Sequence, residues 1–297
     1  MSNAMEWLQF VLAPQMINGL SIGVAVVLIA LGLTIIFGLL DVINMAHGEF
    51  YAIGAYLAVA LLGLGLSFWW ALVLTPLLMA VLGYATERGL IQRVFHSKDR
   101  HTLTLLLTFG VAVVLEDALK IAFGANPLRL EAPISGATEM VGLFFPNYRL
   151  FVMLFGGALI AAVWLLVFRT SLGAIVRAAA FDRNMSASLG VPVQLVYAGT
   201  FAFGVALAGI AGVLLAPIYS VFPTMGRDFV LIAFSVVIIG GMGSIKGAVL
   251  AGLLLTQVQS ISSLYISPVW SDPLLFGIMV LVLMWRPQGL FGKLGSA

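Results

Sequence analysis

The feature that most constrains this chain is a series of long apolar runs that leave little room for charge. A helix needs about 20 apolar residues to cross the hydrocarbon core of a bilayer, and nine runs approach that length within the 297 residues. They cover residues 11–40, 45–66, 68–88, 103–124, 150–168, 194–217, 228–242, 247–264 and 272–286. Only 9% of the residues are charged, whereas a soluble domain carries about 25%. The sequence therefore predicts an all-α integral membrane protein, a polytopic helix bundle of eight or nine crossings.

The rest of the composition removes several classes of function. Residues 1–4 contain Ser2-Asn3-Ala4 before Met5, which is typical of an expression-tag remnant, so one transmembrane domain is expected over residues 5–297. There is no cysteine, which excludes disulfides, thiol chemistry and cysteine-based metal sites. The net charge is only +2 and the basic residues are spread through loops, so nothing supports nucleic acid binding.

The distribution of basic residues predicts how the chain faces the membrane. They gather in three segments: Arg88, Arg93, Lys98 and Arg100 in one loop, Arg169, Arg177 and Arg183 in a second, and Arg286 and Lys293 in the tail. The segments that must lie opposite, 125–149 and 218–228, carry fewer basic residues or balance them with acids. Cytoplasmic loops are enriched in Lys and Arg. We therefore expect a cytoplasmic C-terminus, and external loops at 125–149 and at 218–228, which contains Arg227.

The segment Ser171–Pro192, SLGAIVRAAAFDRNMSASLGVP, is too long and too well patterned for a simple turn between two membrane runs. Good helix formers fill it, and Gly173 and Gly190 bracket it. Asp182 is suited to cap a second short helix, so a helix–turn–helix and one kinked helix both fit the pattern. The alternatives are an ordinary surface loop and a structured cytoplasmic element that contacts another protein.

Two runs are broken by short polar or glycine-rich stretches, which predicts discontinuous helices. The first break lies in LLDVINMAHGEF, and the second, GGMGSIKG, contains Gly240, Gly241, Gly243 and Gly247. In transporters, broken helices at matching places in two halves often flank the substrate path. The sequence alone leaves open whether each break lies at the membrane midplane or forms a tight turn at the surface.

Polar residues cluster in the first break: Asp41, Asn44, His47 and Glu49. Their donors and acceptors suit the ammonium and carboxylate of a small zwitterion, and they are equally suited to cap half-helices and tie the break to its neighbours. A metal site is not expected, because the only other histidines, His96 and His101, fall in the cytoplasmic loop.

A second group of charges, Glu116, Asp117 and Lys120, lies in the fourth run. Glu116 and Lys120 are four residues apart, in the favourable order for an ion pair along a helix, and a self-neutralising pair is the favoured interpretation over a proton relay. No nucleotide-binding motif and no Ser–His–acid set occurs, and no cofactor is expected. Any energy from ATP must therefore come from another subunit.

Four motifs resemble one family of membrane proteins, the LivH-type permeases of branched-chain amino acid ABC importers. They are FGLLDVINMAHGEFYAIGAY, RAAAFDRNMSASLGVPV, VVIIGGMGSIKGAVLAGLL and RPQGLFG, and they occur in the family's order from Met5 to the tail. The resemblance implies a single permease domain in the bacterial inner membrane. Permeases for urea and short amides look similar, so the resemblance leaves the substrate open between those compounds and leucine, isoleucine and valine.

The resemblance also implies partners and a coupling surface. Such a permease pairs with a second, LivM-like permease or with a copy of itself, two cytosolic ATPases dock beneath, and a periplasmic or lipid-anchored binding protein delivers substrate. The family's cytoplasmic coupling segment maps onto Arg177, Ala178, Asp182, Ala187, Leu189 and Gly190. Phe181 departs from the pattern, because relatives often carry an acid before the aspartate.

Two other functions stay open at this stage. A secondary transporter or channel acting alone would need no ordered cytoplasmic segment, and it would need intramembrane acids or a cation site. An intramembrane enzyme would need a nucleophile or metal constellation, which the sequence lacks.

Overall fold

The computed structural model describes residues 7–94, 97, 99–140, 143–267 and 270–292, so the tag remnant expected at 1–4 lies outside the described residues. Apart from a two-stranded hairpin and one isolated bridge, the regular structure of these residues is helical. The helices are η1 (Leu8–Leu12), α2 (Ala13–Leu40), α3 (His47–Gly63), α4 (Phe68–Thr86), η2 (Glu87–Ile91), α5 (Gln92–Val94), α6 (Arg100–Phe123), α7 (Asn147–Arg169), α8 (Ser171–Phe181), α9 (Arg183–Ser188), α10 (Val193–Leu215), α11 (Met225–Gly240), α12 (Ile245–Ser262) and α13 (Ser271–Trp285).

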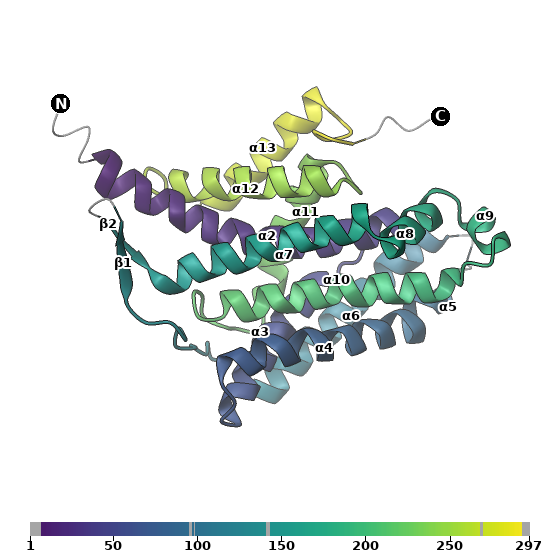
Figure 1. Ribbon diagram of the computed structural model, residues 1–297, viewed down its shortest axis with the longest axis horizontal. Coiled ribbons are helices and arrows are strands. Elements are labelled where there is room, and N and C mark those ends of the chain that lie inside the picture. The colour runs from purple at the N-terminus through teal and green to yellow at the C-terminus, as the bar shows by residue number, and fades with distance from the viewer. Residues whose placement is uncertain (1–6, 95–96, 98, 141–142, 268–269, 293–297) are drawn as a thin grey trace.

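The long helices run side by side along one direction, which gives the molecule two ends (Figure 1). At one end lies the hairpin of β1 (Ala137–Met140) and β2 (Leu143–Pro146), which pair antiparallel within the segment expected as an external loop. At the other end lie α8 and α9. These are called the hairpin end and the α8–α9 end below.

Six helices are long and apolar enough to cross a membrane, judged by length and composition over the described residues. They are Phe10–Leu40, Phe68–Val94, Arg100–Phe123, Asn147–Arg169, Val193–Leu215 and Ile245–Ser262. The other three apolar runs also form helices, but α3, α11 and α13 have only 17, 16 and 15 residues. All nine runs are therefore helical, while the number of complete crossings stays a prediction.

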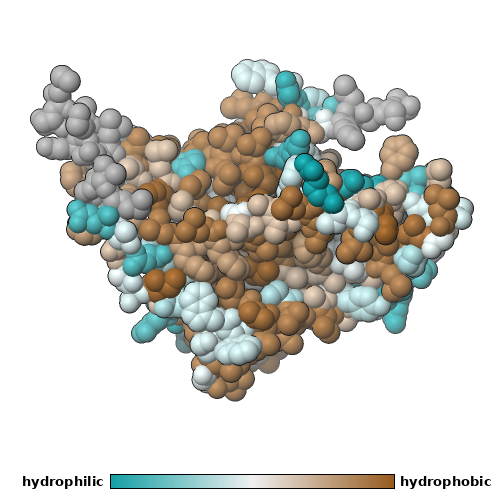
Figure 2. All heavy atoms as spheres, viewed as in Figure 1, coloured by the Kyte–Doolittle hydropathy of each residue, from teal (hydrophilic) through white to brown (hydrophobic). Residues whose placement is uncertain are grey.

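Helix α2 forms the centre of the bundle. Of its spanning window 83% is buried, and it contacts α12, α10, α7 and α11. The outer helices α6 and α7 bury only 22% of theirs. Hydrophobic residues cover most of the visible middle of the surface, and hydrophilic ones gather towards the two ends (Figure 2). This distribution fits a helix bundle whose middle is surrounded by lipid.

Close backbone contacts between glycines hold the inner helices together. A side chain added at Gly54 of α3 would meet the backbone of Gly209 in α10, and one added at Gly204 of α10 would meet the carbonyl of Gly32 in α2. Small residues allow this approach in lipid, where burial from water no longer drives helix association. The glycine repeat along α10 therefore packs helices as expected, except at Gly199, which faces open space.

Candidate functional site

The first break carries the chain from one end of the bundle back into its middle. Helix α2 ends at Leu40. The next residue, Asp41, has a left-handed φ of 53°, and its carboxylate lies 3.3 Å from Arg100 and 3.5 Å from His101. Six residues later, a ring nitrogen of His47 lies 3.0 Å from the carbonyl oxygen of Ile29. Ile29 precedes Asp41 by 12 residues, which is about 18 Å of helix. The break therefore returns deep into the bundle, and α3 begins there as a half-helix.

The four polar candidates of this break do not converge on one cavity among the described residues. Asp41 lies at the α8–α9 end in contact with α6. Asn44 is fully buried, and its side-chain oxygen accepts a hydrogen bond from the backbone N–H of Ala46 at 3.1 Å. His47 is also fully buried. Asn44 thus has one structural partner inside the break and His47 has one on α2, and a role in binding substrate stays a prediction.

Like Asn44 and His47, whose Nδ2 and Nδ1 atoms have no hydrogen-bond partner among the described residues, Glu49 is buried without a complete set of partners. Its residue is 3% exposed, and its Oε2 atom has no hydrogen-bond partner among the described residues. It lies against Gly226 at the start of α11, and Gly48 meets the carbonyl of the same glycine. The N-terminal ends of the half-helices α3 and α11 therefore meet inside the bundle, with this carboxylate between them.

The second break is a turn at the α8–α9 end. Gly241 and Gly243 have φ of 99° and 79°, which only glycine adopts readily, and Ser244 caps α12 by accepting a hydrogen bond from Gly247. Gly240 and Gly247 are in backbone contact across the turn. The two breaks therefore differ in depth, although each interrupts two apolar runs.

An apolar cavity of about 280 Å³ lies beside the first break on the side of the α8–α9 end. Residues from α2, the first break, α6, α11 and the second break line it: Leu33, Phe37, Ile43, Met45, Leu105, Phe234, Val237, Ile238 and Met242. Ile43 and Met45 flank the buried Asn44, so the break contributes its apolar side chains to the cavity. The space suits a small apolar group and offers it no charge.

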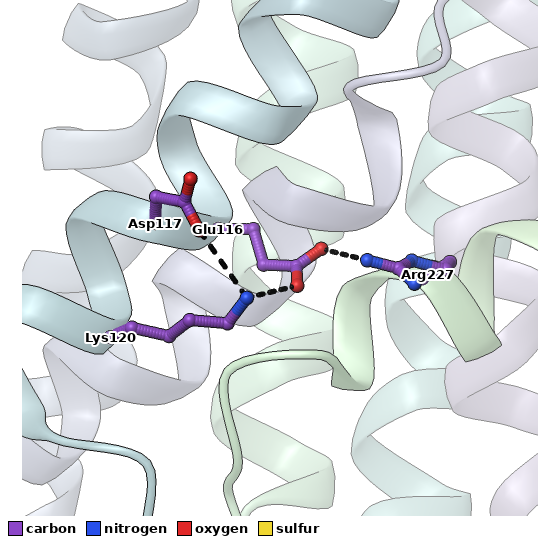
Figure 3. Close-up of polar contacts among 4 residues, drawn as sticks. All are labelled: Glu116, Asp117, Lys120 and Arg227. Carbon is purple, nitrogen blue, oxygen red and sulfur yellow. Dashed lines mark hydrogen bonds and ion pairs between the residues drawn. The ribbon is translucent and has the colours of Figure 1, made fainter.

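A charged cluster joins α6 to α11 near the same half-helices (Figure 3). Glu116 accepts hydrogen bonds from Lys120 at 2.7 Å and from Arg227 at 2.6 Å, and Lys120 also contacts Asp117 at 3.3 Å. The ion pair expected between Glu116 and Lys120 is therefore present. The expectation for Arg227 is wrong: it lies in the first turn of α11 rather than in an external loop, because α11 begins three residues earlier than the apolar run.

The segment after α7 folds as two short helices, as one of the two expected patterns predicts. Asp182 caps α9 through a hydrogen bond from the backbone N–H of Met185 at 2.9 Å. Arg177 donates to the carbonyl of Val167 and lies over the ring of Phe168, so α8 is tied to the end of α7. All six residues expected in the coupling segment are exposed.

An apolar ridge lies on the same two helices and directly after them, and the sequence reasoning did not group its members together. It consists of Phe181, Met185 and Leu189, which are 94%, 62% and 76% exposed. Met185 and Leu189 share one face because they are four residues apart along α9 and its end, whereas the extended backbone of Asp182 separates Phe181 from them.

Comparisons with known proteins identify the family of this chain. The family model described as "Branched-chain amino acid transport system / permease component" matches residues 15–283. The LivH permease protein of Salmonella typhimurium is 31% identical over 294 residues, covering 94% of this chain and 95% of the relative. BraD of Pseudomonas aeruginosa has the same identity and coverage, and LivM of Escherichia coli is 28% identical over 89% of this chain and 67% of its own length. No solved structure gives a significant match. The chain belongs to the family of permease components of branched-chain amino acid transport systems.

Proposed function

We propose that this chain is a transmembrane permease subunit of an ABC importer that carries leucine, isoleucine and valine across the bacterial inner membrane. Family membership supports the transport role, since relatives of nearly equal length are named permease proteins of high-affinity branched-chain amino acid transport systems. Six helices of membrane-crossing length and two half-helices that meet inside the bundle fit such a role.

The proposal that a separate ATPase drives transport rests on the α8–α9 element. It is folded, it presents the ridge of Phe181, Met185 and Leu189, and it is attached to the end of a long helix. Exposed apolar side chains on a rigid short helix suit a groove on a partner protein. We assign that partner as a cytosolic ATPase, with Arg177, Ala178, Asp182, Ala187, Leu189 and Gly190 at or beside the contact.

This attachment supplies a route for movement. Closure of an ATPase pair displaces α8 and α9, and the contacts of Arg177 with Val167 and Phe168 transmit the displacement to α7. Helix α7 packs along the central helix α2. The bundle then alternates between outward-open and inward-open states, and substrate passes near the half-helices.

The complete assembly in this proposal contains a second, LivM-like permease, two cytosolic ATPases, and a periplasmic or lipid-anchored binding protein. The α8–α9 end faces the cytosol together with the C-terminus, in agreement with the basic residues of the Arg169–Val193 segment. Glu49, at the meeting point of the half-helices, is the candidate of the first break that lies nearest the proposed path.

The test is ATP-dependent leucine uptake by the assembly that copurifies with the tagged chain, reconstituted into liposomes. Met185→Glu is expected to abolish copurification of the ATPase and to lower uptake at least about tenfold, because it places a charge on the exposed apolar ridge. Leu64→Glu is the matched control, since Leu64 is 79% exposed in the turn between α3 and α4 at the hairpin end. Leucine uptake by the isolated chain without ATP would refute the proposal in favour of a transporter acting alone.

A further inference from the structure

The charged cluster between α6 and α11 is open to the surroundings of the chain, although its centre is buried. The side chains of Arg227 and Asp117 are 64% and 61% exposed, and that of Lys120 is 39% exposed, whereas that of Glu116 is only 7% exposed. Two acids and two bases make the cluster electrically neutral as a whole. Both a cationic group and an anionic group therefore remain accessible on one face of the molecule.

This face lies at membrane depth. Glu116 stands seven residues before the end of α6 at Phe123, about 10 Å from the hairpin end of a helix about 36 Å long. Arg227 contacts Glu116 and therefore lies at the same depth. The hydrocarbon core of a bilayer is about 30 Å thick, so a centred core covers this position well inside its edge.

Exposed charges at this depth are incompatible with a lipid covering. Ionisable residues within membrane segments face the interior of a bundle or a water-filled space, and they mark substrate and ion pathways. The α6–α11 face is therefore wet in the assembled transporter. Because the described part of the chain leaves this face uncovered, the water must lie between it and the rest of the assembly.

The chemistry of the face matches the head group of an amino acid. The guanidinium of Arg227 uses its Nη2 atom for Glu116, and its fork of donors suits a carboxylate. Asp117 offers a carboxylate oxygen for an ammonium group beside Lys120. Arg227 also lies in the first turn of α11, where the helix dipole favours a bound anion, and the unpartnered Oε2 atom of Glu49 lies behind it at Gly226.

An apolar site follows on the same face of α11. Phe234 and Ile238 come seven and eleven residues after Arg227, so all three share one side of the helix. Both Phe234 and Ile238 line the 280 Å³ cavity. Seven residues of helix is about 10 Å, which is too far for one leucine to reach both sites at once. The charged cluster and the cavity are therefore successive sites along one route towards the α8–α9 end.

We propose that the cluster of Glu116, Asp117, Lys120 and Arg227 forms a water-exposed binding site for the zwitterionic head group of the amino acid in transit. The carboxylate binds Arg227 and the ammonium binds Asp117, before the side chain enters the apolar cavity. This inference rests on the proposed transport of branched-chain amino acids and adds the residues that bind the charged part of the substrate.

The absence of cysteine from the chain allows a direct test in the complete assembly embedded in lipid nanodiscs. Val113→Cys and Leu231→Cys place a thiol on the proposed face, one helical turn from Asp117 and from Arg227, at residues that are 45% and 43% exposed. Leu154→Cys is the control: Leu154 is 76% exposed on α7 and stands seven residues from its hairpin end, as Glu116 does on α6. The probe is a membrane-impermeant, positively charged methanethiosulfonate reagent.

The two test thiols are expected to react at least about tenfold faster than the control, because lipid covers only the control. Saturating leucine should slow both reactions, and leucinol, which lacks the carboxylate, should not. Slow reaction at both test positions would show that lipid or a subunit covers the face. If leucine and leucinol protect the thiols equally, or if neither protects them, the cluster does not bind the head group. Each result overturns this inference alone if the same samples import leucine with ATP. Failure of the assembly that contains the unmodified chain to import leucine refutes the proposed function.

Discussion

The cap of α9 is a single hydrogen bond on which the shape of the coupling element depends. Helix α9 has six residues, too few to be stable by itself, and the side chain of Asp182 accepts a hydrogen bond from Met185 at its first turn. Replacing an N-cap aspartate with alanine costs about 1 kcal/mol. A cost of that size changes an opening equilibrium about fivefold. Asp182→Ala is therefore expected to open α9 about five times more often.

Hydrogen exchange and transport measure the two halves of this prediction. The backbone amide of Leu189, which donates to the carbonyl of Met185 at 3.1 Å, should exchange about fivefold faster in Asp182→Ala, and ATP-dependent leucine uptake should fall because the ridge is less often in place. Asp182→Asn is the matched control, since asparagine caps helices as well as aspartate and removes only the charge. It should keep both slow exchange and uptake. Asp182→Arg removes the cap and reverses the charge, so it should lose coupling while the protein still inserts.

Two outcomes would refute this reasoning. If Asp182→Asn loses uptake as fully as Asp182→Ala while the exchange of the Leu189 amide stays slow, the charge contacts the partner and the cap is irrelevant to coupling. If Asp182→Ala exchanges faster and still transports at the normal rate, an ordered α9 is not required.

Three further results are expected. Gly54→Ala should lower the melting temperature, because the added methyl group meets the backbone of α10. Gly199 faces open space, so Gly199→Ala should leave the melting temperature unchanged or raise it. Equal effects of the two variants would contradict the packing role of Gly54. Asn44→Ala and His47→Ala should reduce leucine uptake together with thermal stability, since both side chains are buried and hydrogen-bonded. Loss of uptake at unchanged stability would place these residues in the substrate path instead. Removal of the residues after Arg286 should destabilise the end of α11, because the N–H of Leu290 donates to the carbonyl of Ile239 at 2.8 Å; a melting curve identical to that of the full chain would count against this contact.

The helices were predictable because their signals are local. Each apolar run carries its own periodicity and length, and the cap at Asp182 depends on residues only three positions apart. The family was likewise identified from motifs within the chain. What depends on local sequence was therefore recovered from sequence alone.

The depth of the two breaks was not predictable, because depth is a tertiary property. The residues from Asp41 to Ala46 return alongside α2, and Gly240–Gly247 form a turn at the end of the bundle, yet each is a short polar interruption between apolar runs. A hydropathy profile shows an interruption in either case and does not report which path the backbone takes. Arg227 was misplaced for the same reason, since its partner Glu116 lies 111 residues away.

The end of the chain is fastened to the half-helix that carries Arg227. The N–H groups of Leu290 and Phe291 donate to the last carbonyls of α11, at Ile239 and Gly240, so this tail and that helix move as one body. A fluorophore placed on Phe291→Cys would therefore report the swing of α11 from the surface of the protein, without any label inside the membrane. During a transport cycle its signal should alternate in step with ATP hydrolysis.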